Sequence, residues 1–334
     1  MGIWTASVEA KAGIIHSQLA SARSLASANN GDIDAISRPY LDLLNSLYHN
    51  EFAFAQLADS SDLVARFNGP SVDIYDPTVS IVISIFSDIR EQIRAIAKSI
   101  VGLSTDQRVT WPAQLDPHLS GIAHGSLIVG ITVPEPGMIA TKGNQLEFDG
   151  VSTQVFNSVR GAVRSLSVVA RHINDNQVNE SIREEFPDPA VRDMVMVAAR
   201  RLSPTGRKGI DSVSFYSPET EEREPAYLTP TSRIALSQAL AKPVKVKGYG
   251  DFEGVVREID LDAKRFEIRG VKGIGAIRCV YEGELHNIVR SVLDSRVVVK
   301  GNYETLASQQ PRLIAVDSMD ILKSAEEQLN LPES

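Results

Sequence analysis

Apolar side chains recur with helical spacing most clearly between residues 77 and 101. Isoleucine stands at every fourth position there and then continues the stripe for two more turns: Ile81, Ile85, Ile89, Ile93, Ile96 and Ile100. Asp76 before Pro77 is typical of a helix start, and Gly102 is typical of a helix end. The pattern predicts a helix over residues 77–101 whose isoleucine stripe is buried in the core.

Two more helical patterns occupy residues 5–58, on either side of the stop signal Asn29-Asn30-Gly31. The first is rich in alanine and serine, which let a second helix approach closely, and Asp32 is placed to cap the second. We therefore predict a helical hairpin over residues 1–60, packed on its own chain. The alternative is that residues 5–58 form a dimerisation or partner surface.

Strand and helix patterns mix between residues 61 and 218. Strands are predicted at 63–67 and 71–74, joined by a hairpin turn at Asn68-Gly69, and at 119–123 and 126–133 around His124-Gly125. A short strand is predicted at 145–148 and another at 212–216. Helices are predicted near 151–173 and from Asp188-Pro189 to residue 202. This predicts a mixed α/β module with a partly antiparallel sheet.

A charged, turn-rich stretch at 219–225 marks the next boundary, and a capped helix starts at Thr229-Pro230, so residues 219–242 form a linker and short helix. Short strand patterns then follow one another at 244–247, 254–260, 265–269, 276–281, 296–301 and 312–316. A predicted helix at 282–293 interrupts them after the fourth. Strands at this spacing predict a small barrel over residues 243–322, with a tail at 323–334.

Three barrel segments carry a resemblance to known proteins. They are Val255-Val256-Arg257-Glu258-Ile259-Asp260, Arg265-Phe266-Glu267-Ile268 and Val297-Val298-Val299-Lys300-Gly301. Together with the strand order, they resemble the OB-like C-terminal barrels of uncharacterised bacterial multidomain proteins. The resemblance covers about a quarter of the chain and implies no catalytic residue. The predicted fold class is α+β: a helical hairpin, a mixed α/β module and an OB-like barrel.

Composition narrows the compartment and the partners. The chain has 334 residues, a formal charge of −8 and 6% aromatic residues, which disfavours a protein built mainly to hold nucleic acid. Its single cysteine, Cys279, excludes an intrachain disulfide and fits a reducing compartment. No apolar run approaches the ~20 residues that a bilayer requires, and a signal-peptide pattern is missing. We expect a cytoplasmic protein without a membrane segment.

Catalytic and metal motifs are not recognisable. The segment Gly248-Tyr249-Gly250-Asp251-Phe252-Glu253-Gly254 precedes a strand instead of opening a helix, so we interpret it as a glycine-bent barrel turn and not a dinucleotide site. His124-Gly125-Ser126 lacks the surroundings of a nucleophile elbow. The six histidines are scattered without metal-ligand spacing. We expect no cofactor, no metal and no enzymatic activity, although a site assembled from distant residues would be hidden.

Two groups of cations could bind a phosphate or a nucleic-acid backbone. The denser group is Arg200, Arg201, Arg207 and Lys208, where the alternative is that cations complement a helix C-terminus. The second is a possible barrel face of Lys245, Lys247, Arg269, Lys272 and Arg278. Charges of the whole barrel balance, which disfavours this second group.

The leading hypothesis is a cytosolic, non-enzymatic binding or regulatory protein whose partner is another protein, conceivably in a bacterial defence or toxin–antitoxin module. Nucleic-acid binding through the barrel or the loop around Arg207 is the first alternative. An enzyme whose site the sequence does not reveal is the second.

Overall fold

The computed structural model describes residues 2–72, 77–102, 116–123, 126–133, 151–174, 177–217, 226–242, 244, 248–305 and 310–323. The chain divides into two compact units, each built from separate stretches. Unit 1 comprises Met1–Phe86, Ala113–Gly143 and Pro204–Tyr227, and unit 2 comprises Ser87–Pro112, Asn144–Ser203 and Leu228–Ser334. Both units combine helices with β-sheet, so the predicted α+β class is confirmed. The predicted domain boundaries concern independent folding and stay predictions.

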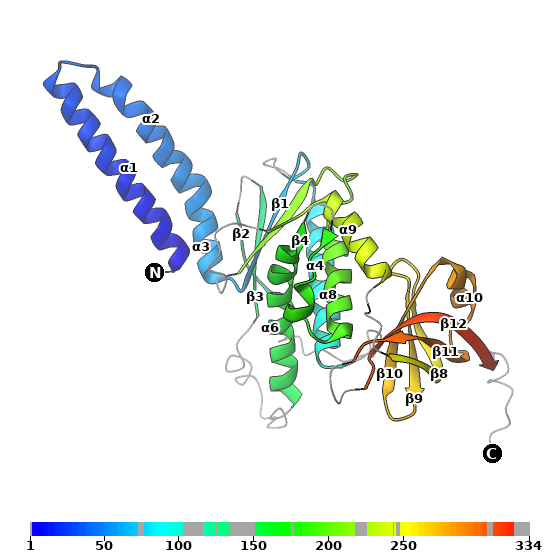
Figure 1. Cartoon of the computed structure of the whole chain (residues 1–334). Coiled ribbons are helices and arrows are strands. Elements are labelled where there is room, and N and C mark those ends of the chain that lie inside the picture. Colours follow the sequence, from blue (N-terminus) through cyan, green and yellow to red (C-terminus); the bar gives the residue numbers. More distant parts are fainter. Residues whose placement is uncertain are drawn as a thin grey trace. The chain divides into compact units, whose positions relative to one another are not determined.

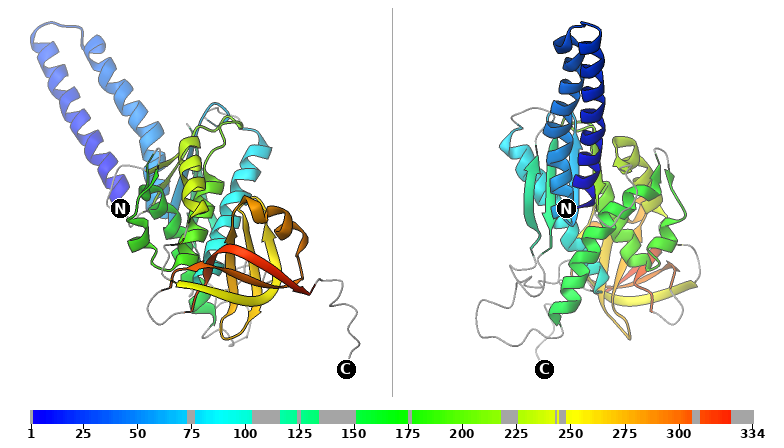
Figure 2. Two further views of the ribbon diagram at one scale, coloured as in Figure 1. Left: turned by 45° about the vertical axis from the view of Figure 1, so that its right-hand side comes forward. Right: turned by 90° about the vertical axis from the view of Figure 1, so that its left-hand side faces the viewer.

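Unit 1 begins with the predicted helical hairpin. Helix α1 (Ile3–Ala28) and helix α2 (Ile33–Ser46) lie side by side in opposite directions in every view (Figures 1 and 2). A π-helical segment, η1 (Leu47–Phe52), joins α2 to helix α3 (Ala53–Ser60). The hairpin interior is a narrow apolar cluster contributed by α1, α2, η1 and α3, namely Val8, Ala12, Leu19, Leu44, Leu47 and Ala55.

Carboxylates cap both helices of the hairpin. Asp32 accepts hydrogen bonds from the backbone N–H groups of Asp34 and Ala35, as its position before α2 predicts. Asp59, at the end of α3, accepts from the backbone N–H groups of Trp4 (3.0 Å) and Thr5 (2.9 Å). Burial alone would raise the pKa of Asp59, but the hydrogen bonds from Thr5 and Trp4 outweigh it and lower that pKa. The base of the hairpin is thereby tied to α3.

The sheet of unit 1 has the strand order β2-β3-β1-β6-β7, and its pairs β2–β3, β3–β1 and β1–β6 are antiparallel. Their bounds are β1 Leu63–Asn68, β2 His118–Ala123, β3 Leu127–Thr132, β6 Ser212–Tyr216 and β7 Ala226–Leu228. The predicted pairing of the 119–123 and 126–133 strands is confirmed. The hairpin predicted at Asn68-Gly69 is wrong, because β1 pairs with β3 and β6, both distant in sequence, and Ser71-Val72 is a turn.

Helix α3 packs on this sheet at close range. Leu57 and Ala58 form a cluster with Val64 of β1 and Ile128 of β3. A Cβ atom on Gly130 would lie 2.6 Å from a Leu57 methyl and 2.4 Å from the Ser61 hydroxyl. Glycine is required there because α3 approaches the β3 backbone so closely. The hairpin is thus anchored to the sheet through α3.

Helices dominate the first part of unit 2. The predicted isoleucine helix is α4 (Val79–Ile100), whose residues from Ser87 onward belong to this unit; Ile89, Ile93 and Ile96 are buried as expected. The predicted cap Asp76 lies outside the described residues. The other elements are α6 (Val151–Val169), η3 (Ala170–His172), β4 (Ile173–Asn174), β5 (Gln177–Val178), α7 (Ile182–Glu185), α8 (Pro189–Leu202) and α9 (Pro230–Ala241). The strand predicted at 145–148 also lies outside the described residues.

The rest of unit 2 is a closed barrel with strand order β10-β12-β11-β8-β9. Its elements are β8 (Gly248–Asp260), β9 (Arg265–Val271), β10 (Gly275–Tyr281), η4 (Gly283–Leu285), α10 (His286–Ser291), β11 (Arg296–Tyr303) and β12 (Leu313–Lys323). Three strands form a meander, the third pairs in parallel with the fifth, and a helix precedes the fourth. This is the topology of an OB fold, so the predicted OB-like barrel is confirmed.

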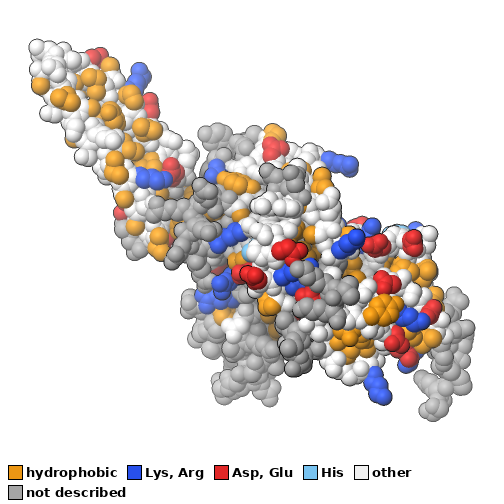
Figure 3. Space-filling model, in the orientation of Figure 1, with side chains coloured by type: hydrophobic (Ala, Val, Ile, Leu, Met, Phe, Trp, Pro, Cys, Tyr) orange, Lys and Arg blue, Asp and Glu red, His pale blue; other side chains and the backbone are white. Residues whose placement is uncertain are grey.

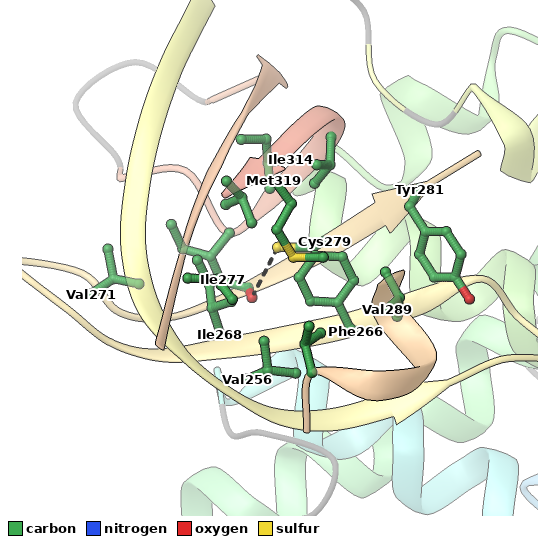
Figure 4. Close-up of a cluster of buried hydrophobic side chains, with 14 residues drawn as sticks. Val256, Phe266, Ile268, Val271, Ile277, Cys279, Tyr281, Val289, Ile314 and Met319 are labelled. Atoms are coloured by element: carbon green, nitrogen blue, oxygen red, sulfur yellow. Dashed lines mark hydrogen bonds between the residues drawn. The ribbon is translucent and has the colours of Figure 1, made fainter. Parts of the chain in front are cut away.

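Alternate residues of the strands fill the barrel. Phe266, Ile268, Ile277 and Cys279 point into a dry core that Val289 of α10 closes (Figure 4). Burial raises the pKa of the Cys279 thiol well above its usual value, as expected for an inert, apolar cysteine. The glycine-bent turn predicted at 248–254 is wrong, because the whole segment lies within β8. The predicted strand at 244–247 falls almost entirely outside the described residues.

Candidate functional site

OB folds bind ligands mainly on the outer face of their second and third strands and on the loops after the first and fourth strands. The second and third strands here are β9 and β10. Because Phe266, Ile268, Ile277 and Cys279 point inward, the alternating neighbours point outward. Those outward residues are Arg265, Glu267, Arg269, Arg278 and Val280, and we call this surface the barrel face.

Helix α8 of the same unit covers the barrel face. Ala190 in its first turn packs against Val280 of β10 and Leu313 of β12. The side chain of Arg278 donates to the carbonyl oxygen of Ala190 at 3.4 Å. Burial lowers the pKa of Arg278, although Asp193 and other nearby carboxylates oppose the shift.

A bidentate ion pair fixes the middle of α8 to the barrel face. Arg265 Nη2 lies 2.6 Å from Asp193 Oδ1, and Arg265 Nε lies 3.1 Å from Asp193 Oδ2. Asp193 is completely buried and Arg265 is 6% exposed. The remaining Arg265 donors reach the carbonyl oxygens of Ala263 and Leu240 at 2.8 and 2.9 Å. Both charges are therefore fully satisfied, which a buried pair requires.

Further ion pairs join α8 to the two loops that OB folds use for ligands. At the N-terminus, Asp188 caps α8 and also accepts from Arg312, next to β12. Arg192 donates to Glu304, after β11, at 2.9 Å. At the C-terminus, Arg201 Nη2 lies 2.5 Å from Asp260 Oδ2, where β8 ends.

Helix α8 itself begins where the sequence predicts. Asp188 accepts from the N–H groups of Ala190 and Val191, and Pro189 needs no acceptor in the first turn. The helix is buried on nearly all sides, so its charged side chains must be paired rather than solvated. The ligand surface of the OB fold is therefore an internal contact of unit 2.

The predicted cation group at residues 200–208 is split by these contacts. Arg201 is paired with Asp260, and Arg200 donates to the Asp262 carbonyl at 3.3 Å. Burial lowers the pKa of Arg200, and the neighbouring Arg233 lowers it further. Arg207 and Lys208 are exposed and belong to unit 1, whereas Arg200 and Arg201 belong to unit 2.

The predicted barrel cations also have acidic neighbours. Arg269 donates to Glu267 at 2.9 Å, and Arg278 lies directly opposite Glu267 in the β9–β10 register. Lys272 is exposed in the loop between these strands. The remaining two members of the group, Lys245 and Lys247, lie outside the described residues. The barrel face thus carries alternating charges in contact, rather than a free basic patch.

A cavity of about 710 Å³ lies beside the barrel, between the end of α9 and the strands β10 to β12. Its polar lining is mostly acidic: Lys242, Glu282, Glu284, Asn302 and Asp317. Asp317 accepts from the Asn302 amide at 3.1 Å. Tyr281 also lines it, and burial raises the pKa of its hydroxyl. No group of metal-ligating side chains gathers anywhere among the described residues.

The sequence did not reveal the pairs that hold α8. The one available signal was Arg192-Asp193, two adjacent opposite charges followed by six apolar residues within a predicted helix. Such a pair inside a helix buried on all sides needs partners elsewhere. With the geometry known, comparison with other proteins adds nothing: no family model matches the chain, and no curated protein matches it in sequence.

Proposed function

We propose that this chain is a non-enzymatic binding protein whose partners are proteins. The observation that carries the proposal is the closed barrel face. The surface that an OB fold would offer to an oligonucleotide or a sugar is occupied by α8 and held by ion pairs whose charges are buried. The barrel face of this chain is thus covered by its own helix α8 instead of being open to such a ligand.

Charge supports the same conclusion. The chain carries a formal charge of −8, and Arg200 and Arg201 are already engaged with the barrel. Arg207 and Lys208 remain as exposed members of that group, and two cations contribute only a weak, salt-sensitive attraction to phosphates. Among the described residues, no helix is long and apolar enough to cross a membrane. We propose a cytoplasmic location from the cysteine content and leave the process unassigned.

An exposed apolar surface supplies the place for a protein partner. Figure 3 shows apolar side chains along both helices of the hairpin, with few charged ones between them. Large apolar side chains exposed there include Ile3, Ile14, Leu25, Ile36, Leu41, Leu43 and Tyr48. Several large exposed apolar side chains on one element favour a protein-interaction site there.

The proposal is tested by purifying the native chain with and without nuclease treatment and measuring its binding to labelled oligonucleotides. We expect any co-purifying partner to be a protein that survives nuclease. In fluorescence anisotropy at about 50 mM salt, single-stranded and duplex oligonucleotides should not bind. Binding that disappears in an Arg207→Ala/Lys208→Ala variant would overturn the proposal and place a nucleic-acid site in that loop.

A further inference from the structure

A stripe of uncharged residues runs along α1 from Ile3 to Leu25. Ile3, Ile14 and Leu25 follow one another at eleven-residue intervals, which is close to three helical turns, so they form one stripe on α1. They are 77%, 61% and 65% exposed. The positions between them on the stripe are uncharged: Ser7, Ala10, Gln18 and Ser21.

The charged residues Glu9 and Arg23 lie on another side of α1, together with His16. Glu9, His16 and Arg23 recur at seven-residue intervals and form a second stripe. Arg23 on that side donates to the Ser37 hydroxyl of α2 at 2.9 Å. Lys11 lies between the first stripe and the interior and is engaged with Glu51 at 2.6 Å.

Helix α2 extends the uncharged side. Successive residues of a helix are rotated by about 100°. Measured from the residues of each helix that face the hairpin interior, Ile36 and Leu43 fall on the same side as the Ile14 stripe. Leu43 is 57% exposed. Asp34 and Arg38 fall on the side of Glu9 and Arg23. We call the surface formed by Ile3, Ile14, Leu25, Ile36 and Leu43 the hairpin face.

The α1 stripe is nearly the same when read in either direction from Ile14. Ile3 on one side corresponds to Leu25 on the other, Ser7 to Ser21, and Ala10 to Gln18. Two copies of α1 packed antiparallel about a twofold axis at Ile14 would therefore place Ile14 on Ile14 and each Ile3 on a Leu25. A surface that complements itself under a twofold rotation is what a symmetric dimer uses.

The charge and the size of the hairpin face also favour a second copy of the chain as its partner. Two copies of an acidic chain repel each other, and they can approach along the uncharged α1 stripe without placing like charges together. A face two helices wide and about 30 Å long offers on the order of 700 Å² per copy. That is close to the ~800 Å² per partner of a stable interface.

We propose that the hairpin face binds the same face of a second copy, so that two hairpins form an antiparallel four-helix bundle. The inference rests on the proposed protein-binding function and names the partner. It gives a reason for the exposure of Ile14 and Leu25, which stay 61% and 65% exposed within one chain. It also predicts the register of the dimer, with Ile14 at the twofold axis.

Sedimentation equilibrium of the full chain tests the dimer. We expect twice the 36.4 kDa of one chain at micromolar concentration. An Ile14→Glu/Leu25→Glu variant should sediment as a monomer with an unchanged far-ultraviolet circular dichroism spectrum, because both side chains are exposed in the single chain. His16→Glu is the matched control on the opposite side of α1 and should stay dimeric. A monomeric wild type, or a dimer that survives the double substitution, would overturn the proposal.

Cysteine cross-linking tests the register. The only native cysteine, Cys279, is buried, so an introduced cysteine reports alone. Ile14→Cys should form a disulfide-linked dimer under mild oxidation, because its two copies meet at the axis. Ile3→Cys should cross-link when mixed with Leu25→Cys and much less by itself. Equal cross-linking by His16→Cys would overturn the register.

The two proposals fail separately. A monomer that binds no oligonucleotide and keeps a nuclease-resistant protein partner would overturn the self-association and leave the proposed function standing. An oligonucleotide complex formed by a dimer would overturn the proposed function and leave the self-association standing.

Discussion

The barrel face and the hairpin face differ in both charge and exposure. Arg265, Glu267, Arg269 and Arg278 make the barrel face highly charged, yet α8 closes it. The apolar residues of the hairpin face stay between 38% and 77% exposed, and the ion pair of Lys11 with Glu51 lies beside them. A charged surface is therefore not necessarily a binding surface, and an uncharged one on a protruding element can be.

The ion pairs of the barrel face and the apolar residues of the hairpin face also specify different packing arrangements. The bidentate Arg265–Asp193 pair fits one register of α8, because a shift by one residue would leave both charges buried and unpaired. The apolar stripe of α1 instead specifies a pairing by its symmetry about Ile14. Substitutions in the ion pairs of the barrel should therefore cost most stability where α8 buries the pair and least where the pair is exposed.

The largest effect is expected from Asp193→Ala. This change leaves the Arg265 guanidinium buried without its anion, and such a change costs about 3–5 kcal/mol of the free energy of unfolding. Urea denaturation measures the loss, and the rate at which a thiol reagent labels Cys279 reports the opening of the barrel core. We expect labelling to become faster in the variant.

An Asp193→Leu/Arg265→Met double variant is the control for this effect. Replacing both charges by apolar side chains should recover most of the lost stability, because no buried charge remains unpaired. A loss below 1 kcal/mol in the single variant would mean that α8 does not bury the pair.

A smaller effect is expected from Arg201→Ala. Its ion pair with Asp260 lies at the edge of the contact between α8 and the barrel, and the two side chains are 39% and 26% exposed. Water screens such a pair, so we expect a loss of about 1 kcal/mol in urea denaturation and a weak salt dependence. A loss of stability as large as that of Asp193→Ala would show that water screens the Arg201–Asp260 pair no better than the buried Arg265–Asp193 pair.

The smallest effect is expected from Arg296→Ala on the exposed side of the barrel. Arg296 and Glu253 lie 2.6 Å apart, but their side chains are 53% and 47% exposed. Exposed pairs contribute about 0–1 kcal/mol, so the urea midpoint should hardly move. A large shift would contradict the distinction between covered and exposed pairs on this barrel.

Local patterns predicted most of the fold. The hairpin, the isoleucine helix, α8 and the strand order of the barrel follow from periodicity and capping, which act between near neighbours. The sheet of unit 1 was missed in part, because Asn68-Gly69 suggests a local turn whereas β1 pairs with strands far away in sequence. Tertiary pairing overrode the turn signal there.

The candidate surfaces were predicted less well, for a physical reason. Arg200 and Arg201 look like free cations in the sequence, and only the folded chain brings Asp260 and the Asp262 carbonyl to them. Asp193 and Arg265 are 72 residues apart, so no local pattern could pair them. The exposed stripe on α1 was not predicted, because its exposure depends on which side of α1 faces α2.

Sedimentation velocity with a fluorescein-labelled single strand tests both faces in one experiment. The oligonucleotide should be about 20 nucleotides long, which exceeds the site of one OB fold, and the salt about 50 mM. We predict that the protein sediments as a dimer while the label stays free, because the hairpin face is occupied by a second copy and the barrel face by α8. A monomeric protein, or a label that sediments with the protein, would contradict this.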